Sequence, residues 1–467
     1  MRSLFAVVAA LGLSSIGTGC VVHSVDPNPQ PAIGGQEETR SYRNDPDATE
    51  SNANHRPRAV SGRWWESFRD HDLDSLVSQA LADNPDLRAT GRRIDQANAS
   101  LIRAGATLFP QIDGGGDLSR RWNREGRTDD EASLGLSLDW ELDAWGRIRS
   151  GRSARAEEVE AAKEDWQAAR LLLTGAVAET WFELIEQRGQ LRLAQEQIEV
   201  NQTLLDLTRL RFGQGQSSVV DVLQQQEQLE STQALVPDIE ARIEELELAL
   251  ETLTGRLPGT RHLPERNDEP AEPPARPKAG YPADLLAERP DLRAQRARIV
   301  ALDHEVGEAV ADCLPRFSIG SSLALAGTPS LDHLIGDAIA GAVGPVFDAG
   351  SRKSEVTRRR SRVQEEVDRY TFAYLNAVRD VETSLQRETK LAERVRRQEA
   401  QLNTARKLLA ESRNRYSLGA TDYLPVLDAV AKVQGLERDL LTSRRERLSA
   451  RVALHRALGG PMPEMPR

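Results

Sequence analysis

The feature that most constrains the fold of this chain is an internal repeat that covers most of its length. The motif NPDLRA at residues 84–89 returns as RPDLRA at 289–294, which is 205 positions later. Four further landmarks return at a spacing of 204 or 205 positions: LFPQI as CLPRF, LDAWGR as FDAGSR, RFGQG as RYSLG, and ALETLTG as ALHRALG. Landmarks that stay in register through both halves indicate a tandem duplication. Each half is therefore predicted to build the same structural unit.

Each half is predicted to begin with a helix that is followed by two β-strands. In the first half the helix covers residues 86–106, and Pro110 closes it. From Leu134 to Leu142 every second side chain is apolar and polar residues or Gly lie between them, which is typical of a strand with one apolar face. The expected strands cover residues 111–122, 134–142 and 317–326 and a Gly- and Ala-rich segment near 339–347.

Long helices are predicted after each strand pair. Apolar residues recur every seven positions over residues 177–205, 222–250, 395–416 and 426–454. Arg447 interrupts the last of these series. A sustained seven-residue repeat indicates a coiled-coil seam, and the short Gly-containing turns at 213–218 and 418–421 make the paired helices antiparallel neighbours. The first long helix, from about residue 145 to 212, would be roughly 100 Å long.

The composition excludes several classes of function. The chain has a net charge of -11 and 28% charged residues, which argues against a nucleic-acid partner. Its seven His residues lack metal-ligand spacing, and with no catalytic motif in the sequence we expect neither an enzyme nor a cofactor. After the N-terminus the chain contains no stretch of about 20 apolar residues, so a membrane crossing would have to use strands. Four strands are too few for a closed barrel, and subunits would therefore have to pool them.

The first 20 residues, MRSLFAVVAALGLSSIGTGC, read as an export signal. They resemble a bacterial lipoprotein signal, in which Cys20 becomes the acylated first residue of the mature chain, and a plain secretory signal is the alternative. Residue 21 is Val rather than Asp, so the resemblance points to the outer membrane. A multiply acylated cysteine would anchor the chain firmly to lipid.

The expected organisation follows from these signals. It consists of a signal peptide (1–19), an acylated N-terminal linker (20–60), a first repeat (61–257), a Pro-rich linker (258–282), a second repeat (283–460) and a C-terminal tail (461–467). The polar residues 24–60 are expected to be poorly ordered.

The whole pattern resembles outer-membrane efflux lipoproteins of the TolC and OprM type, also described as NodT-like. The similarity begins at RWWESFRDHDLDSLVSQALADNPDLRA (63–89), takes in both halves and ends near Gly460. It implies a mainly α fold with a membrane β-barrel portion and tandem long coiled-coil hairpins. Four strands from each of three protomers would form a 12-stranded β-barrel, and the helices would continue it as an α-helical barrel across the periplasm.

The resemblance also assigns roles to the turns between the long helices. Family members dock a periplasmic adaptor there with an Arg, an aromatic residue and a Gly. The matching residues are Arg211, Phe212 and Gly215 at one turn and Arg415, Tyr416 and Gly419 at the other. Gly at these places also suits a plain tight turn, because such turns often need a positive φ.

A periplasmic gate is the second role that the resemblance implies. Asp428 stands where the family places a ring of aspartates from three protomers, although a solvated helix face is the alternative. Asp221 and Tyr416 match two members of the closing network of TolC itself. Thr421 and Pro425 replace a network Arg and a second ring aspartate, so the closing network is expected to be weaker or differently connected.

The sequence thus predicts a homotrimeric exit duct in outer-membrane lipid. Its partners would be a periplasmic adaptor and an inner-membrane pump, expected to be of the RND type because members of such pumps are often lipidated. Two alternatives stay open: the exit channel of a type I protein secretion system, and a structural periplasmic coiled-coil lipoprotein. The exported compound, the partner pump and the open or closed state are not encoded in any motif of the sequence.

Overall fold

The computed structural model describes residues 22–32, 41–46, 62–122, 128–260, 272–327 and 331–460. The predicted signal peptide, Cys20 and the tail 461–467 lie outside these residues. The chain divides into two compact units. The sheet unit comprises Met1–Ile33, Gly91–Asp165 and Asp291–Ala373, and the hairpin unit comprises Gly34–Thr90, Trp166–Pro290 and Tyr374–Arg467.

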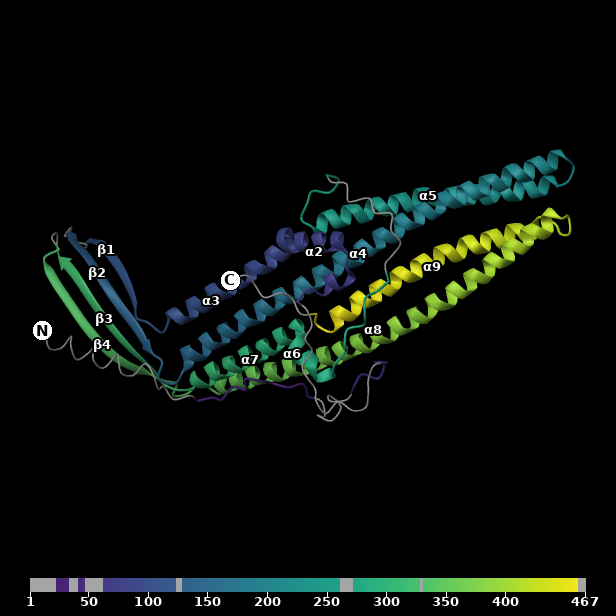
Figure 1. The fold of residues 1–467 in the computed structure, drawn as a ribbon. Helices are drawn as coiled ribbons and strands as arrows, with labels where there is room; N and C mark the ends of the chain where they lie inside the picture. The colour runs from purple at the N-terminus through teal and green to yellow at the C-terminus, as the bar shows by residue number, and fades with distance from the viewer. Residues whose placement is uncertain are drawn as a thin grey trace. The chain divides into compact units, whose positions relative to one another are not determined.

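The sheet unit contains one four-stranded antiparallel sheet in the order β1-β2-β3-β4 (Figure 1). The strands are β1 (Gln111–Trp122), β2 (Thr128–Leu142), β3 (Arg316–Gly327) and β4 (His333–Val343). The first three confirm the predicted strand positions, with β2 starting earlier than predicted. The two repeats meet between β2 and β3, where Leu136 faces Leu323.

The predicted position of the fourth strand was wrong. We expected it near residues 339–347, whereas β4 ends at Val343 and begins at His333. Its pairing with β3 sets both ends, because Arg316 lies opposite Val343 and Ala326 opposite His333. Pro345 has no N–H with which to continue the ladder. Gly and Ala also mask the alternation, so the sequence alone did not reveal the register.

The sheet has two chemically different faces, since side chains alternate along each strand. One face carries large apolar side chains that are exposed, among them Ile112, Leu118, Leu134, Leu136, Leu323, Leu325 and Leu334. The other carries mainly short polar and acidic side chains, among them Asp113, Asp117, Ser137, Asp139, Ser322 and Asp337, while β4 adds the exposed apolar side chains of Ile335, Ile339 and Val343 to it. Trp122 is exposed at the far end of β1, while at the helical end the indole of Trp140 donates to the Leu108 carbonyl at 3.0 Å.

The sheet unit also contains helices on both sides of each strand pair in the sequence. Helices α3 (Pro85–Ala106) and α7 (Pro290–Ala311) precede the strands, and the first parts of α4 (Arg147–Gly213) and α8 (Ser351–Ser417) follow them. An aspartate before each long helix satisfies its first N–H groups. Asp143 accepts from the N–H of Ile148 at 2.9 Å, and Asp348 accepts from that of Arg352 at 3.3 Å. The repeated motif around residues 143 and 348 thus encodes the strand-to-helix junction.

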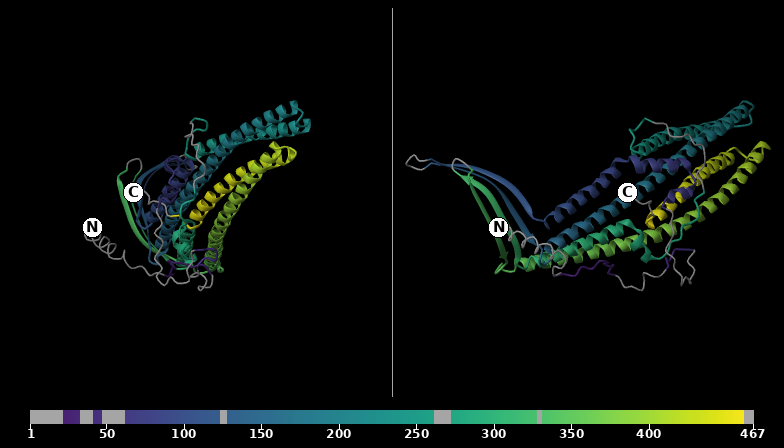
Figure 2. Two further views of the ribbon diagram at one scale, coloured as in Figure 1. Left: turned by 45° about the vertical axis from the view of Figure 1, so that its right-hand side comes forward. Right: turned by 60° about the vertical axis from the view of Figure 1, so that its left-hand side comes forward.

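The hairpin unit holds two antiparallel helical hairpins. The second part of α4 pairs with α5 (Val219–Leu253), and the second part of α8 pairs with α9 (Leu424–Ala457), as Figure 2 shows from two sides. The remaining elements of this unit are the 3-10 helices η1 (Trp64–Phe68) and η2 (Pro282–Asp284) and the helices α2 (His71–Asp83) and α6 (Leu285–Glu288). Both α4 and α8 are 67 residues long, in agreement with the sequence prediction.

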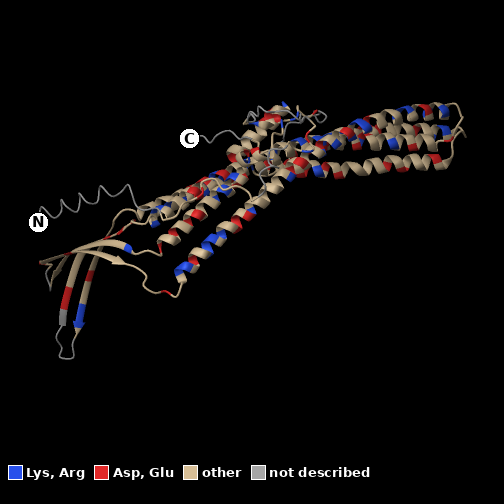
Figure 3. Cartoon of the chain, turned by 90° about the horizontal axis from the view of Figure 1, so that it is seen from below, with Lys and Arg blue, Asp and Glu red and all other residues tan. Residues whose placement is uncertain are grey.

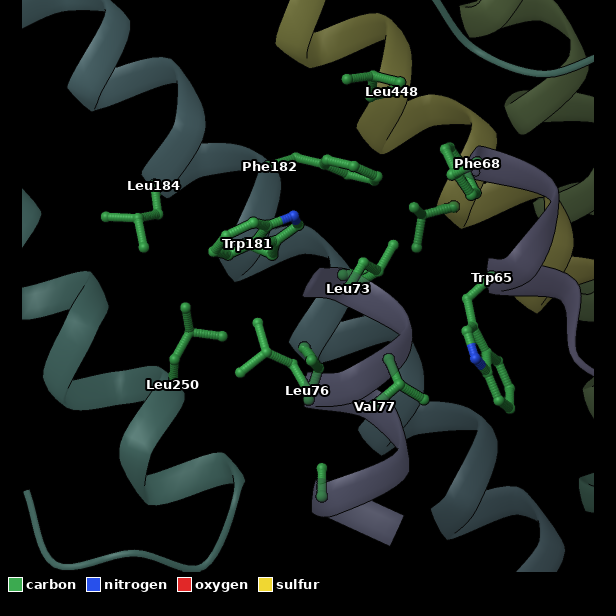
Figure 4. Close-up of a cluster of buried hydrophobic side chains, with 14 of the residues drawn as sticks. Trp65, Phe68, Leu73, Leu76, Val77, Trp181, Phe182, Leu184, Leu250 and Leu448 are labelled. Atoms are coloured by element: carbon green, nitrogen blue, oxygen red, sulfur yellow. The ribbon is translucent and has the colours of Figure 1, made fainter. Parts of the chain in front are cut away.

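The hydrophobic core of this unit is built around η1 and α2 (Figure 4). Trp65 and Leu73 pack with Trp181 of α4, Leu250 of α5 and Leu448 of α9, and all five are buried. The Trp181 indole donates to Asp70 at 2.9 Å, so its buried N–H is satisfied. The entry motif at residues 63–89 therefore packs between three long helices and links them through buried contacts. Within the described residues, none of the helices is both long and apolar enough to cross a bilayer.

A polar seam lies beside the apolar heptad positions of α4, α5 and α9. Asn201 and Gln434 are buried and exchange hydrogen bonds, with Gln434 Nε2 donating to Asn201 Oδ1 at 3.1 Å. Asn201 also donates to Thr232 of α5 at 2.9 Å. Nearer the core, buried Glu186 accepts from Thr442 and Arg445 at 2.7 and 2.9 Å. The heptad pattern had predicted only the apolar contacts.

Of residues 24–60, for which the sequence predicted poor order, the structure describes 24–32 and 41–46. In the sheet unit, His23 and the backbone of Asp26 bond Asp303 of α7 at 2.7 and 3.0 Å. In the hairpin unit, Tyr42 is buried, and the backbone N–H of Asn44 donates to Glu382 at 2.9 Å. Side chains of α7 and α8 hold these segments although the segments lack helix or strand, and composition could not reveal such contacts.

Candidate functional site: the hairpin tips

The two hairpin tips are closed by the same backbone geometry. In the first, the N–H of Gln216 donates to the Arg211 carbonyl at 2.8 Å, and Gly215 has a φ of 73°. In the second, the N–H of Ala420 donates to the Arg415 carbonyl at 2.9 Å, and Gly419 also has a φ of 73°. A positive φ is strained for residues that carry a Cβ. Both glycines thus have a structural role in ending α4 and α8.

Asp221, in the first turn of α5, helps to cap the N-terminus of its own helix. Its carboxylate accepts from the Ser218 N–H at 2.9 Å and from the Ser217 hydroxyl at 2.7 Å, and the Ser218 hydroxyl accepts from the Asp221 N–H at 3.2 Å. This reciprocal pair is a capping box, which satisfies two free donors of a helix start. In this structure the predicted gate residue Asp221 thus shapes the first tip.

The structure brings together four side chains, which we call the tip cluster: Arg211 of α4, Gln225 of α5, Tyr416 of α8, and Tyr423 just before α9. The guanidinium carbon of Arg211 lies 4.2 Å from the ring centroid of Tyr416. The rings of Tyr416 and Tyr423 are 5.2 Å apart and tilted by 59°. The Tyr423 hydroxyl donates to Gln225, whose own side chain donates to the Asn201 carbonyl at 3.0 Å.

The electrostatics of the tip cluster follow from burial. Tyr423 is only 2% exposed, and burial raises its pKa to about 12. Its hydroxyl is therefore neutral at physiological pH and free to donate. The hydroxyl of Tyr416 has no hydrogen-bond partner within the described residues, so the ring rather than the hydroxyl makes the contact with Arg211. A cation over an aromatic face is attracted by the ring quadrupole.

The other predicted site residues lie apart from this cluster. Asp428 is exposed on the second turn of α9 and has no ion pair within the described part of the chain. Lys432 is exposed one turn further on. Arg415 bonds Glu411 of its own helix at 2.8 Å, and the Phe212 ring is exposed at the end of α4. Pro425 occupies the first turn of α9, where a missing N–H costs nothing.

An open groove of about 580 Å³ lies beside the tip cluster between α4 and α8. Its walls include Leu204, Leu207, Arg211, Arg413, Tyr416 and Tyr423. The lining of this groove is mostly apolar and includes two arginines.

Sequence reasoning placed Arg211 and Tyr416 in separate roles and did not single out Tyr423 or Gln225. The signal for Tyr423 was available: it lies seven residues after Tyr416, immediately before α9 begins. Its partner Gln225 belongs to the other repeat, and no spacing in the sequence links the two. Within the described residues no three His, Cys, Asp or Glu side chains are close enough together to hold a metal ion.

Comparisons with known proteins identify the family. Residues 76–256 and 281–460 match the family model described as outer membrane efflux protein. The chain is 30% identical over 414 residues to the pyoverdine export outer membrane protein OpmQ of Pseudomonas putida, covering 85% of this chain and 88% of that protein. It is 27% identical to the cation efflux system protein CusC of Escherichia coli, covering 85% and 88% of the two chains.

A solved structure has the same fold. The outer-membrane channel OprN superimposes with a TM-score of 0.83 at 26% identity, over 94% of this chain and 99% of that one. Both segments of the family match contain one complete copy of the repeated helix-strand-strand-hairpin series. This chain therefore belongs to the family of outer membrane efflux proteins and is itself a protein of the outer membrane.

Proposed function

We propose that the chain forms a homotrimeric channel, the exit duct of a tripartite efflux pump for small molecules. The observation that carries this proposal is the four-stranded sheet, which exposes one apolar face and one face that is polar along β1, β2 and β3, and has β1 and β4 at its edges. An open edge and bare apolar surface are both unfavourable in an isolated chain. Edges that pair between three copies would give a closed 12-stranded β-barrel with lipid outside and water inside.

The polar face of the sheet suits the inner wall of such a barrel. Asp113 and Asp117 of β1, Asp139 of β2 and Asp337 of β4 fall on this face by their register. Acidic linings favour cations over anions. The hairpins would continue the wall as an α-helical barrel in the periplasm, and energy for transport would come from the pump rather than from this chain, which we propose is not an enzyme and needs no cofactor.

At the far end of the duct we propose a gate. Asp428 is exposed near the second tip, so three copies would place a carboxylate ring around a common axis. Mutual repulsion and cation affinity would then control passage. In this proposal Tyr416 closes the tip through Arg211, and Asp221 contributes by holding the first tip in shape.

The tips are also the proposed contact with a periplasmic adaptor. The exposed ring of Phe212, the exposed Arg415, and Arg211 at the rim of the groove lie at the tips that Gly215 and Gly419 close. The adaptor would connect the duct to an inner-membrane pump, for which we propose the RND type. A covalent lipid on Cys20 would anchor each protomer in the outer membrane.

The cargo class rests on the names of relatives. Those names refer to export of pyoverdine, of cations and of solvents. Because these cargoes share little chemistry, we propose that the duct passes small molecules that its pump selects. The exit channel of a type I protein secretion system is the second candidate.

The decisive experiment uses the full chain purified in detergent. Native mass spectrometry should give a trimer, and planar lipid bilayers should show discrete cation-preferring channels. A monomer without conductance would instead support a structural periplasmic lipoprotein and overturn the duct.

Mass analysis of the wild-type chain and of Cys20→Ser would test the lipid anchor. Only the wild type should carry acyl chains and remain in the membrane fraction after a salt wash.

A further inference from the structure

Both long helices begin with basic residues, contrary to the usual preference for acidic ones. The first nine residues of α4 contain four arginines and no Asp or Glu. The first twelve residues of α8 contain five arginines, Lys353 and a single acid, Glu355. The N-terminus of a helix carries a partial positive charge, so cations there are unfavourable. The same rule is broken at equivalent places in the two repeats (Figure 3, Lys and Arg in blue).

Acids at the strand-to-helix junctions compensate part of this charge. Arg147 bonds Glu141 at 2.8 Å and Arg149 bonds Asp143 at 3.0 Å. In the second repeat Arg352 lies 3.4 Å from Asp348. These pairs account for the first turn of each helix, and further along α4 Arg155 is paired with Glu158 of the same helix.

The single acid of the α8 segment is already shared. Glu355 bonds Arg358 at 2.6 Å and Arg359 at 2.9 Å, and these two guanidinium groups hold its pKa at about 2. Arg359 also reaches Glu308 of α7 at 2.9 Å. Lys353 and Arg360 are exposed and lie seven residues apart, hence on one face of α8. Neither they nor the exposed Arg152 of α4 has an ion pair among the residues that the structure describes.

The position of Arg152, Lys353 and Arg360 in the fold indicates which kind of ligand could neutralise their charge. Helix α4 begins five residues after β2, and α8 begins eight residues after β4. At this end of the sheet Trp140 and Trp145 donate their indole N–H groups to the backbone carbonyls of Leu108 and Pro315 at 3.0 and 2.7 Å. Tryptophans at the end of an exposed apolar face mark the level of lipid headgroups. Arg360 lies about 14 Å along the helix from Ser351, and Lys353 lies closer.

We propose that Arg152, Lys353 and Arg360 form a basic collar that binds the headgroups of anionic phospholipids in the leaflet facing the periplasm. The inference rests on the proposed function, because it requires the sheet to span the outer membrane. Phosphate-bearing headgroups supply the negative charge that the helix starts lack. A basic residue next to an anionic membrane surface strengthens the attraction by roughly fivefold. The collar would fix the depth at which the sheet enters the bilayer.

The test uses the full chain reconstituted into vesicles that contain equal amounts of phosphatidylethanolamine and phosphatidylglycerol. After mild extraction, native mass spectrometry counts the retained lipids. The wild type should retain phosphatidylglycerol preferentially. Lys353→Gln combined with Arg360→Gln should lower its retention at least tenfold, because two charges are removed from exposed positions. Glu355→Gln should raise it, since Arg358 and Arg359 lose their shared acid.

The matched control is Arg396→Gln combined with Lys407→Gln, which removes two exposed charges from α8 in the hairpin unit. This control should retain phosphatidylglycerol like the wild type. Equal loss in the control, unchanged retention in the collar variant, or no preference over phosphatidylethanolamine in the wild type would each overturn the collar. Conductance in the same vesicles separates the two proposals: a wild type without channels refutes the duct, whereas normal channels with unchanged lipid retention refute only the collar.

Discussion

The guanidinium of Arg211, in the last turn of α4, lies over the ring of Tyr416, in the last turn of α8, at 4.2 Å from its centroid. The two residues come from different repeats and form a direct link between the two tips. In the proposed duct, opening would require the two hairpins that this contact joins to separate.

We expect Arg211→Met to weaken this link. The substitution keeps an apolar stem and removes the cation, and a partly buried cation–π contact contributes about 1–2 kcal/mol. A double-mutant cycle with Tyr416→Leu, followed by chemical unfolding in detergent, should give a coupling free energy of that size. Channels of Arg211→Met should also spend more time open. Arg209→Met, two residues earlier and exposed, is the control and should show no coupling with Tyr416→Leu.

The Tyr423→Phe variant should show how much the buried hydroxyl of Tyr423 contributes to stability. At about pH 8 we expect the variant to be less stable by about 0.5–1.5 kcal/mol, because the hydrogen bond to Gln225 is lost. Burial raises the pKa of Tyr423 from 10.0 to about 12, so the unfolded chain releases this proton at a lower pH than the folded chain does. The stabilisation is therefore complete below about pH 10 and falls as the pH rises toward 12.

Unfolding midpoints at about pH 8 and pH 11 measure this difference. The gap between wild type and Tyr423→Phe should narrow at the higher pH. Tyr416→Phe serves as the control, since its hydroxyl has no partner in the described residues and its removal should cost little. A stability difference between the two proteins that stays constant from about pH 8 to pH 11 would contradict the raised pKa of Tyr423.

Asp428→Ala should raise single-channel conductance and weaken block by divalent cations. The reason is the loss of three carboxylates that repel one another and attract cations at the constriction. Lys432 lies on the same exposed face one turn away, so Lys432→Ala should have the opposite effect and strengthen the block. Asp422→Ala, at an exposed turn position, provides a matched loss of charge. If Asp422→Ala and Asp428→Ala change conductance equally, Asp428 does not form a ring.

In the polar seam, replacing one of two hydrogen-bonded amides should cost more stability per substitution than replacing both. Asn201→Leu leaves the buried Nε2 of Gln434 without its acceptor and removes one donor to Thr232, which we expect to cost about 1–3 kcal/mol. Adding Gln434→Leu removes the second unsatisfied amide, so the double variant should lose less stability than the sum of the two single variants. Chemical unfolding of all three variants measures this. Strict additivity would show that the two amides are not coupled.

Much of the fold could be predicted because its signals are local. The alternation from Leu134 to Leu142 predicted β2, and the seven-residue repeat predicted both helical hairpins. The strand β4 could not be predicted in the same way. Its Gly and Ala residues carry little periodic signal, and its ends depend on the hydrogen bonds that β3 offers. Register is a property of two strands, and the sequence of one strand does not contain it.

The site was only partly predictable. Arg211 and Tyr416 were identified through the resemblance, each with its own role, while their mutual contact and the presence of Tyr423 and Gln225 became visible only in the structure. Asp221 was expected in a gate network, and the structure shows its carboxylate bonded to Ser217 and Ser218 in the turn itself. A capping box can be read from four consecutive residues, whereas a contact between repeats cannot.

The sequence by itself determined the duplication, the order of helices and strands, and the apolar and polar faces of the sheet, because each depends on residue types at short, regular spacings. Only the tertiary structure decided which residues of one repeat meet which residues of the other: β2 beside β3, Asn201 against Gln434, and Arg211 over Tyr416. These partners are separated by about two hundred positions. Packing and hydrogen-bond satisfaction of the folded chain select them, and no period along the sequence records that selection.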